Sequence, residues 1–344
     1  MIEKLYRIGV LGLSHDHVWG NLDDLVSTPG GVLVSVADPN QPLLDKAHER
    51  YDCGVYRDFE ELLDREQLDA VYIFADNATT VGLGEAAAAK NLHIMVEKPM
   101  AADLEGADRL LAAARSAGTR LMVNWPFAWW PQLQLALEMT RLGAIGDVFQ
   151  VKYRAAHAGP KELGCSPYFC QWLYDAELNG GGALIDYGCY GALLARAILG
   201  MPARVYAAMG RFVKEDILIE DNGLLVMNYP RAMALAEASW SQIGNLTSYT
   251  VVIYGTTGTL LVEPGRNGRL LLATDEHRDG AEVQVPEPAN DMSSASAHFL
   301  NSIRRGTPHF VLCQDRVSRD AQEILEAGFF SAESGGEVSL PLRL

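Results

Sequence analysis

Three residues whose side chains can donate or accept protons occur at two places in this sequence. They are Lys98, and the pair Asp186 and Tyr190. Lys98 comes shortly after an apolar run at 92–96, and Asp186 and Tyr190, four residues apart, follow three consecutive glycines. A lysine held at the end of a buried strand can have its pKa brought toward neutrality by partial desolvation or by nearby charge. Asp186 and Tyr190 share one face if their segment is helical. The pattern predicts one cluster of the three side chains, and its chemistry is proton transfer.

The three glycines at 180–182 distinguish this pattern from an ordinary lysine-proline loop, which is usually solvated. Successive glycines allow a tight turn with close backbone approach. An apolar helical run at 193–198 follows within a few residues, so we expect a turn at the start of a helix and not a linker.

The elements that must position these residues fall into two regions. Up to residue 123, short apolar runs alternate with helical patterns, which is typical of an α/β Rossmann domain with a doubly wound parallel sheet. From 124 to 344, consecutive strand patterns predict an α+β domain with a large, mostly antiparallel sheet. We therefore expect a dinucleotide-binding domain at 1–123 and a substrate-binding and oligomerisation domain at 124–344. Strands are expected at 7–11, 31–37, 68–74, 92–96, 120–123, 148–155, 203–212, 224–229, 233–240, 249–262 and 269–273, and helices at 83–90, 104–117, 131–141, 190–199, 296–304 and 316–327.

Composition bounds the class of protein. The 344 residues are enough for two domains with cores of their own, and 49% apolar with 21% charged residues is typical of a globular protein. With 28 basic and 44 acidic residues the net charge is −16, which argues against nucleic acid or an anionic membrane as partner. There is no basic segment followed by an apolar stretch at the amino terminus, and we expect no membrane-spanning run. A cytoplasmic location follows.

The first expected strand leads into a partial dinucleotide fingerprint. Gly12 takes the first glycine position, while Ser14 and His17 stand where the other two glycines would be. Ser14 is small enough for close approach of a pyrophosphate and adds a hydroxyl donor. Asp38 ends the second strand, where an acid can bind both ribose hydroxyls and repel a 2′-phosphate. No arginine follows in Pro39-Asn40, so the sequence predicts NAD as cofactor, with NADP less favoured.

Histidines and cysteines give no metal or disulfide pattern. His15 and His17 would point about 200° apart at a helix start, and no third ligand is placed near them by sequence. We expect no metal site, and His15 at the cofactor phosphates or over the helix end. Five cysteines, an odd number without Cys-x-x-Cys spacing, predict reduced thiols.

These features together resemble the glucose-fructose oxidoreductase and inositol dehydrogenase (Gfo/Idh/MocA) family. The resemblance covers the whole chain and is carried by Ala37-Asp38-Pro39, the segments 68–77 and 143–148, Glu97-Lys98-Pro99 and the block 180–190. It implies that Lys98 hydrogen-bonds the nicotinamide ribose and the substrate, and that Asp186 orients the reacting hydroxyl. Tyrosine at 190 resembles the subgroup with xylose and dihydrodiol dehydrogenases, in which it is the proton donor or acceptor. A nearby ammonium would lower its pKa.

The resemblance also implies a set of cofactor contacts. They are Gly12, Leu13, Ser14, His15, Asp38, Ala75, Asn77, Thr80, Glu97 and Lys98. For the substrate we expect Asp186 and aromatic surfaces that can stack on a sugar ring, although aromatic residues at 124–130 could equally pack a domain junction. The substrate candidates are Trp125, Arg154, His157, Tyr168 and Trp172.

The function that follows is an NAD(P)-dependent oxidoreductase that moves hydride between nicotinamide and a carbinol or carbonyl carbon of a sugar, inositol or related polyol. Two alternatives stay open: a glycosidase that uses bound NAD for transient oxidation, and a non-catalytic sugar or nucleotide sensor on the same fold. The strand runs 232–240 and 249–254 are apolar on both alternating faces, which predicts a sheet face closed by a second subunit. A homodimer or homotetramer is expected.

Overall fold

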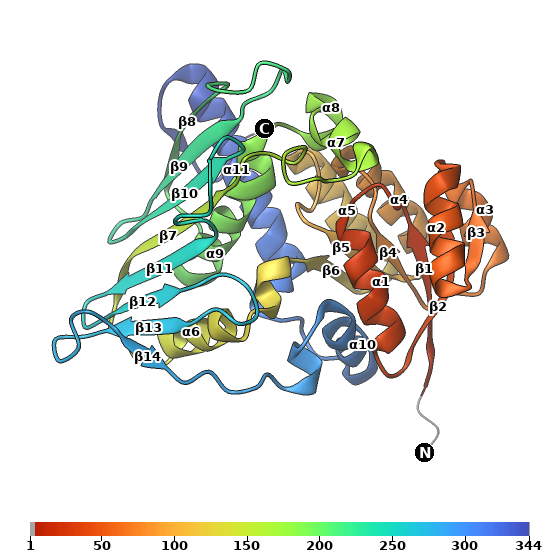
Figure 1. Ribbon diagram of the computed structural model, residues 1–344, viewed down its shortest axis with the longest axis horizontal. Coiled ribbons are helices and arrows are strands. Elements are labelled where there is room, and N and C mark those ends of the chain that lie inside the picture. The colour runs from red at the N-terminus through yellow and green to blue at the C-terminus, as the bar shows by residue number, and fades with distance from the viewer. Residues whose placement is uncertain (1–3, 344) are drawn as a thin grey trace.

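The amino-terminal sheet has six parallel strands in the order β3-β2-β1-β4-β5-β6 (Figure 1). The protein is seen in a computed structural model that describes residues 4–343. β4 and β5 are apolar runs buried along nearly their whole length, as parallel strands covered on both faces must be. The strands are β1 (Tyr6–Leu11), β2 (Gly31–Ala37), β3 (Gly54–Tyr56), β4 (Ala70–Ile73), β5 (His93–Glu97) and β6 (Leu121–Asn124), and the helices are α1 (His17–Ser27), α2 (Gln41–Tyr51), α3 (Phe59–Arg65), α4 (Asn77–Ala89) and α5 (Leu104–Ala117).

The predicted doubly wound fold is confirmed, although α1, α2 and α3 lie at ranges for which no helix was named and two further elements differ from expectation. The three-residue strand β3 was not expected, because Gly54–Tyr56 is too short to show a pattern. Helix α4 begins at Asn77 and not near 83, because the Asp76 carboxylate caps it by accepting the N–H of Thr79. Gly84 then lies inside the helix, where a Cβ would stand 2.2 Å from Cδ1 of Leu110. That glycine lets α4 and α5 pack closely.

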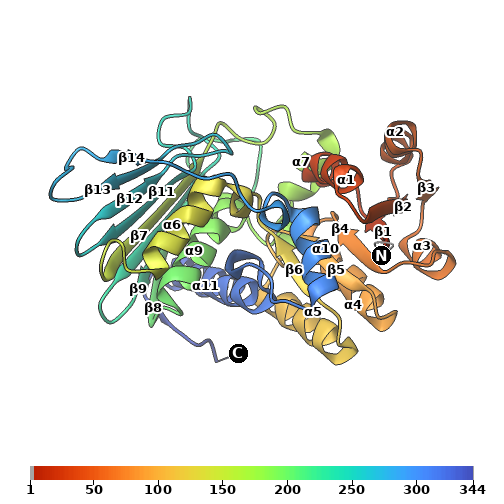
Figure 2. The ribbon, with the colours of Figure 1, turned by 90° about the horizontal axis from the view of Figure 1, so that it is seen from below.

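A second sheet of nine strands, mostly antiparallel, forms the other half of the molecule, as expected. Its order is β14-β13-β12-β11-β7-β10-β9-β8-β15, and β10 and β7 are its parallel pair. Figure 2 shows α6, α9 and α11 against one face of this sheet, whereas no helix of the described residues covers the other face. The strands are β7 (Val148–Ala156), β8 (Arg204–Gly210), β9 (Asn222–Asn228), β10 (Met233–Ser239), β11 (Thr250–Gly255), β12 (Thr259–Val262), β13 (Leu270–Ala273), β14 (Ala281–Val283) and β15 (Val338–Ser339).

Helical segments connect and cover the two sheets. Helix α10 packs on α1, and α11 packs on both α5 and β8, so the carboxyl-terminal helices join the two halves (Figure 2). The segments are η1 (Pro126–Trp129), α6 (Pro131–Arg141), α7 (Pro167–Leu173), α8 (Ala176–Asn179), η2 (Leu184–Gly188), α9 (Cys189–Leu199), η3 (Asn290–Met292), α10 (Ala295–Arg305), η4 (Val311–Cys313) and α11 (Asp315–Ser334).

The stretch Ala176–Leu199 corrects one expectation from the sequence. Its 24 residues are long and apolar enough to cross a membrane by composition, although no such run was expected. Within the protein, 72% of its most apolar window is buried, so the apolar side chains serve the core.

The glycine turn in this stretch is tight as predicted: Gly180 has φ +88, and a Cβ there would lie 2.0 Å from the carbonyl oxygen of Ala102. This turn brings Asp186 against the end of the first sheet.

Candidate active site

Lys98 and Asp186 form a buried ion pair between the two halves of the molecule. The Lys98 ammonium donates to Oδ1 of Asp186 at 2.6 Å and to the Asp186 carbonyl oxygen at 3.1 Å, and both side chains are less than 10% exposed. The other carboxylate oxygen accepts the indole N–H of Trp240 at 3.1 Å. Lys98 stands at the carboxyl end of β5 and Asp186 on the π-helical turn η2. The sequence prediction that these two side chains meet holds in the structure.

The protonation state of Lys98 differs from the expectation. Burial opposes the positive charge, but the charge and hydrogen bond of Asp186, together with the nearby Cys189 and Glu97, outweigh burial, so the pKa of Lys98 is raised above its ordinary value and not brought toward neutrality. This rise could not be predicted from the sequence, because its sign depends on the 2.6 Å contact with Asp186. Lys98 is therefore an ammonium that can donate hydrogen bonds, and it is no free base at neutral pH.

Tyr190 completes the cluster from the first turn of α9. The Lys98 Nζ lies 5.1 Å from the centroid of its ring, and the ring stacks on Tyr153 at 5.7 Å. Burial raises the pKa of Tyr190 well above its usual value, which corrects the expectation that the nearby ammonium would lower it. Both Lys98 and Tyr190 thus carry protons in this arrangement. The cluster is set up to donate a proton to an oxygen in front of it.

The cluster faces a cavity of about 260 Å³. Lys98, Asp186 and Tyr190 all line it, and most of the remaining wall is aromatic. A larger cavity of about 940 Å³ beside α6 is lined by none of the three, so size alone would mislead here. The aromatic rings and the two imidazoles in this wall belong to His17, Phe127, Trp130, Tyr153, His157, Phe169, Tyr187 and Tyr249. Such a wall can stack on a sugar ring and keep water out.

A separate cavity of about 280 Å³, the second cavity of the candidate site, lies at the carboxyl ends of β1, β2 and β4, where the strand order reverses. Gly12 has φ +88, and a Cβ there would stand 2.6 Å from the backbone nitrogen of Ala75. The Asp38 carboxylate accepts the N–H groups of Leu13 at 2.6 Å and Asn40 at 2.8 Å. Asp38 therefore braces the glycine loop, and it also lines the cavity together with Ser14.

The residues around this second cavity fit a dinucleotide. Trp172 lines it, and the indole nitrogen of Trp172 is buried without a hydrogen-bond partner among the described residues. A buried donor left unpaired costs stability, and a phosphate or ribose oxygen would satisfy it. Tyr168 also lines this cavity. Both were expected at the substrate, and the structure places them at the cofactor side instead, because α7 packs over the glycine loop.

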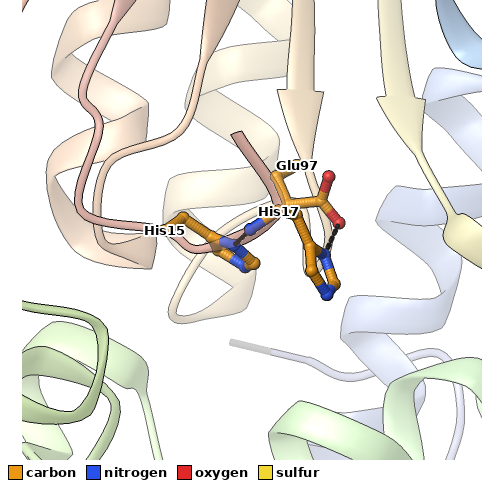
Figure 3. A group of neighbouring side chains, drawn as sticks. All are labelled: His15, His17 and Glu97. Carbon is orange, nitrogen blue, oxygen red and sulfur yellow. Dashed lines mark hydrogen bonds and ion pairs between the residues drawn. The ribbon is translucent and has the colours of Figure 1, made fainter. Parts of the chain in front are cut away.

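His15, His17 and Glu97 form a cluster with ligand-type atoms within 4.8 Å of one another (Figure 3). Nδ1 of His17 lies 3.1 Å from Oε1 of Glu97, and Oε2 of Glu97 accepts an N–H from Asn124 at 2.8 Å. The His15 ring packs on Phe169, and burial lowers its pKa well below the usual value. The sequence did not place Glu97 beside the histidines. Two imidazoles and a carboxylate could ligate a metal ion, but each already has a partner within the protein.

Two residues that were expected at the substrate, Trp125 and Arg154, lie elsewhere. Trp125 is buried away from the cavity and donates its indole N–H to Ser318 at 3.1 Å. Arg154 points to the opposite face of the second sheet, where it pairs with Glu237 at 2.6 Å, because neighbouring residues of a strand alternate.

Of the predicted cofactor contacts, Asn77 and Thr80 lie on α4 and bond within the protein. The Asn77 side chain donates to Asn179, and the Thr80 hydroxyl donates to the Asp76 carbonyl oxygen. Neither lines the second cavity.

Tyr187 and Tyr249 line the cavity but were not predicted from sequence. Tyr187 had a usable signal, since it stands three residues before Tyr190 and therefore on the same face of a helix. Tyr249 had none, because it precedes β11 and reaches the site only through the tertiary fold.

Comparison with known proteins matches both halves of the chain. Residues 7–125 match the oxidoreductase family with an NAD-binding Rossmann fold, and residues 133–261 match the GFO/IDH/MocA C-terminal domain. The dTDP-3,4-didehydro-2,6-dideoxy-alpha-D-glucose 3-reductase of Streptomyces violaceoruber is 28% identical over 337 residues, which cover 94% of this chain and 92% of that protein. The D-xylose 1-dehydrogenase (NADP(+)) of Haloarcula marismortui is 30% identical over 257 residues, which cover 73% and 69%.

The fold also matches solved structures. A levoglucosan dehydrogenase in complex with NADH and levoglucosan superposes with a TM-score of 0.83 at 21% identity, covering 98% of this chain and all of that one. At this identity the likeness concerns the fold.

Proposed function

The chain belongs to the Gfo/Idh/MocA family of NAD(P)-dependent sugar oxidoreductases, and from that premise we propose that it transfers hydride between NAD(H) and a ring carbon of a sugar or cyclic polyol. The observation that carries the proposal is the buried Lys98–Asp186 pair, which faces the same cavity as Tyr190. The second cavity, whose residues fit a dinucleotide, lies on the other side of His15. A nicotinamide cofactor supplies the hydride donor or acceptor, and the three side chains manage the proton.

Each of the three residues has a distinct part in this proposal. Lys98, held as an ammonium by Asp186, donates a hydrogen bond to the reacting oxygen and stabilises negative charge that develops on it. Tyr190 gives its proton to that oxygen when a carbonyl is reduced, or takes one when a hydroxyl is oxidised. Because burial keeps Tyr190 protonated, reduction proceeds at neutral pH, whereas oxidation accelerates at alkaline pH.

We further propose NAD as the preferred cofactor, because Asp38 lines the cavity at the end of β2, where a 2′-phosphate would meet its carboxylate. The guanidinium of Arg57 also lies in this region and donates to the Pro39 carbonyl oxygen at 3.2 Å. No arginine was expected at this place, because none follows directly after Asp38 in the sequence. The charge of Asp38 is therefore what disfavours NADP. If that charge were removed, Arg57 would be the cation that binds the 2′-phosphate of NADP.

The uncovered face of the nine-stranded sheet supports a homodimer. One row of paired residues crosses seven strands of this face, and six of its seven side chains are apolar or aromatic. The row is Tyr206, Val226, Leu235, Lys152, Val252, Leu261 and Leu271. A second copy of the same face would bury it. Sedimentation at micromolar concentration tests this: a monomer would contradict the proposal.

The function itself is tested by a panel of free sugars and cyclic polyols with NAD or NADP at alkaline pH, read as NADH or NADPH absorbance. Native mass spectrometry of the purified protein gives a second readout, the mass of a retained dinucleotide. We expect turnover of a monosaccharide or cyclic polyol with NAD. Failure of every sugar with both dinucleotides would refute the proposal.

A further inference from the structure

Three side chains in the smaller cavity form a hydrogen-bonded chain that the proposed reaction does not use. Nε2 of His157 lies 2.7 Å from the Tyr187 hydroxyl, and that hydroxyl lies 3.0 Å from the hydroxyl of Tyr249. The three residues come from the end of β7, the turn η2 and the residue before β11. They therefore meet only in the folded protein, and all three line the cavity of Lys98 and Tyr190.

The direction of the hydrogen bonds follows from His157. Its Nδ1 accepts the backbone N–H of Gly159 at 2.8 Å, so that nitrogen carries no proton. The neutral imidazole then carries its proton on Nε2 and donates it to Tyr187. Tyr187 in turn donates its own proton to Tyr249.

One proton of this chain has no partner inside the protein. The imidazole and the two hydroxyls supply three protons, and the two contacts of the chain use two of them. The proton left over belongs to Tyr249, whose oxygen accepts from Tyr187 and has no other hydrogen bond among the described residues. The chain thus presents one hydroxyl donor to whatever occupies the cavity.

The backbone at Tyr249 is an independent sign that the position matters. Tyr249 has φ +55, in the left-handed region that bulky side chains rarely adopt. Such conformations persist where the surrounding structure imposes them, and they cluster at ligand-binding sites. The preceding residue is fixed, because the Ser248 hydroxyl donates to the Ala156 carbonyl oxygen at 2.7 Å and accepts from Gln242 at 2.8 Å. The strained backbone holds the hydroxyl of Tyr249 at Tyr187.

Size and charge define the ligand that this donor meets. The cavity of about 260 Å³ is smaller than the roughly 300–1,000 Å³ typical of sites for drug-sized ligands. The lysine, the aspartates and His17 that line it have partners within the described residues: Lys98 pairs with Asp186, His17 contacts Glu97, and Asp16 accepts the N–H of Ser166. No free cation is left there for a phosphate or a carboxylate.

We propose that His157, Tyr187 and Tyr249 are the specificity-determining group of this site, and that they bind an acceptor oxygen of an uncharged, monosaccharide-sized substrate. The inference rests on the proposed function and narrows its substrate class to free sugars and cyclic polyols. The oxygen bound by Tyr249 is distinct from the reacting oxygen at Lys98. A nucleotide-linked sugar would have to place its diphosphate outside this cavity, because the cavity has neither the room nor the unpaired positive charge for it.

The test compares wild type with Tyr249→Phe, which removes the hydroxyl and keeps the ring. Steady-state kinetics are measured with the best free sugar of the panel and with its monodeoxy analogues. In the wild type, one analogue should lose about tenfold or more in kcat/KM, since a site built to bond an oxygen rejects the compound without it. In Tyr249→Phe the parent sugar should lose a similar factor, chiefly through KM, and should no longer be distinguished from that analogue.

Tyr229→Phe is the matched control, because the hydroxyl of this partly buried residue donates to the Gly200 carbonyl oxygen at 3.2 Å outside the cavity. It should leave the kinetics unchanged. An unchanged kcat/KM in Tyr249→Phe would overturn the inference, as would an equal loss for all analogues or better turnover of a nucleotide-linked sugar. If no sugar of any kind is turned over by the wild type, the proposed function fails instead, and this inference falls with it.

Discussion

Replacing Lys98 by methionine separates the structural part of the buried ion pair from its chemical part. Methionine is unbranched and of similar length, so it fills the space of the lysine stem. Asp186 would then keep only the indole N–H of Trp240 while remaining buried. Breaking a buried pair by removing one partner costs about 3–5 kcal/mol. For 344 residues unfolding in one transition, the entropy of unfolding is about 0.7 kcal/mol/K, so Tm should fall by about 4–7 °C.

The double variant Lys98→Met/Asp186→Asn removes both charges and should recover most of that loss. Activity should not recover with it. Both variants should lose about a hundredfold or more in kcat/KM, because the group that donates to the reacting oxygen is absent in each. Differential scanning calorimetry and steady-state kinetics on the same preparations measure the two quantities. An unchanged Tm in Lys98→Met, or a double variant no more stable than the single one, would refute the reasoning about the pair.

Three further predictions concern the cofactor cavity and the response to acid. Asp38→Ala should reverse the preference from NAD to NADP in fluorescence titrations, because the carboxylate that repels the 2′-phosphate is gone while Arg57 stays. Tighter binding of NADP than of NAD by the wild type would show the cofactor assignment to be wrong. Gly12→Ala should weaken NADH binding by about tenfold or more, because a side chain at φ +88 with its Cβ 2.6 Å from the Ala75 nitrogen would strain the glycine loop. An unchanged dissociation constant for NADH would contradict this role of the loop. Burial lowers the pKa of His309 to about 3, so between pH 6.5 and 3 the unfolded chain binds a proton that the folded chain does not, and stability falls as the pH drops. His309→Gln should flatten this part of the Tm profile, and an unaltered slope would exclude His309 as its source.

The parts of the site that could be predicted are those set by local pattern. Continuous apolar runs located the parallel strands, and the ends of those strands carry Asp38 and Lys98. Helical spacing placed Asp186 and Tyr190 on one face. These inferences need only the period of each element and the rule that strand ends of a parallel sheet meet at one edge.

The parts that could not be predicted depend on contacts between distant segments. Arg154 and Tyr153 are neighbours in β7, and only the pairing of that strand decides which of them faces the cavity. Trp125 was expected at the substrate but became part of the core. The protonation of Lys98 and Tyr190 is likewise set by burial and by the distance to Asp186, neither of which is written in the local sequence.

The measurement that tests the central claim most directly is the kinetics of Tyr190→Phe beside its dinucleotide affinity. The claim is that Tyr190 exchanges the proton of the reacting hydroxyl, in front of a lysine held charged by Asp186. NADH titration followed by fluorescence should give the wild-type dissociation constant, whereas kcat/KM for the free sugar should fall by about a hundredfold or more. A Tyr190→Phe variant that binds NADH normally and retains wild-type kcat/KM would contradict the account.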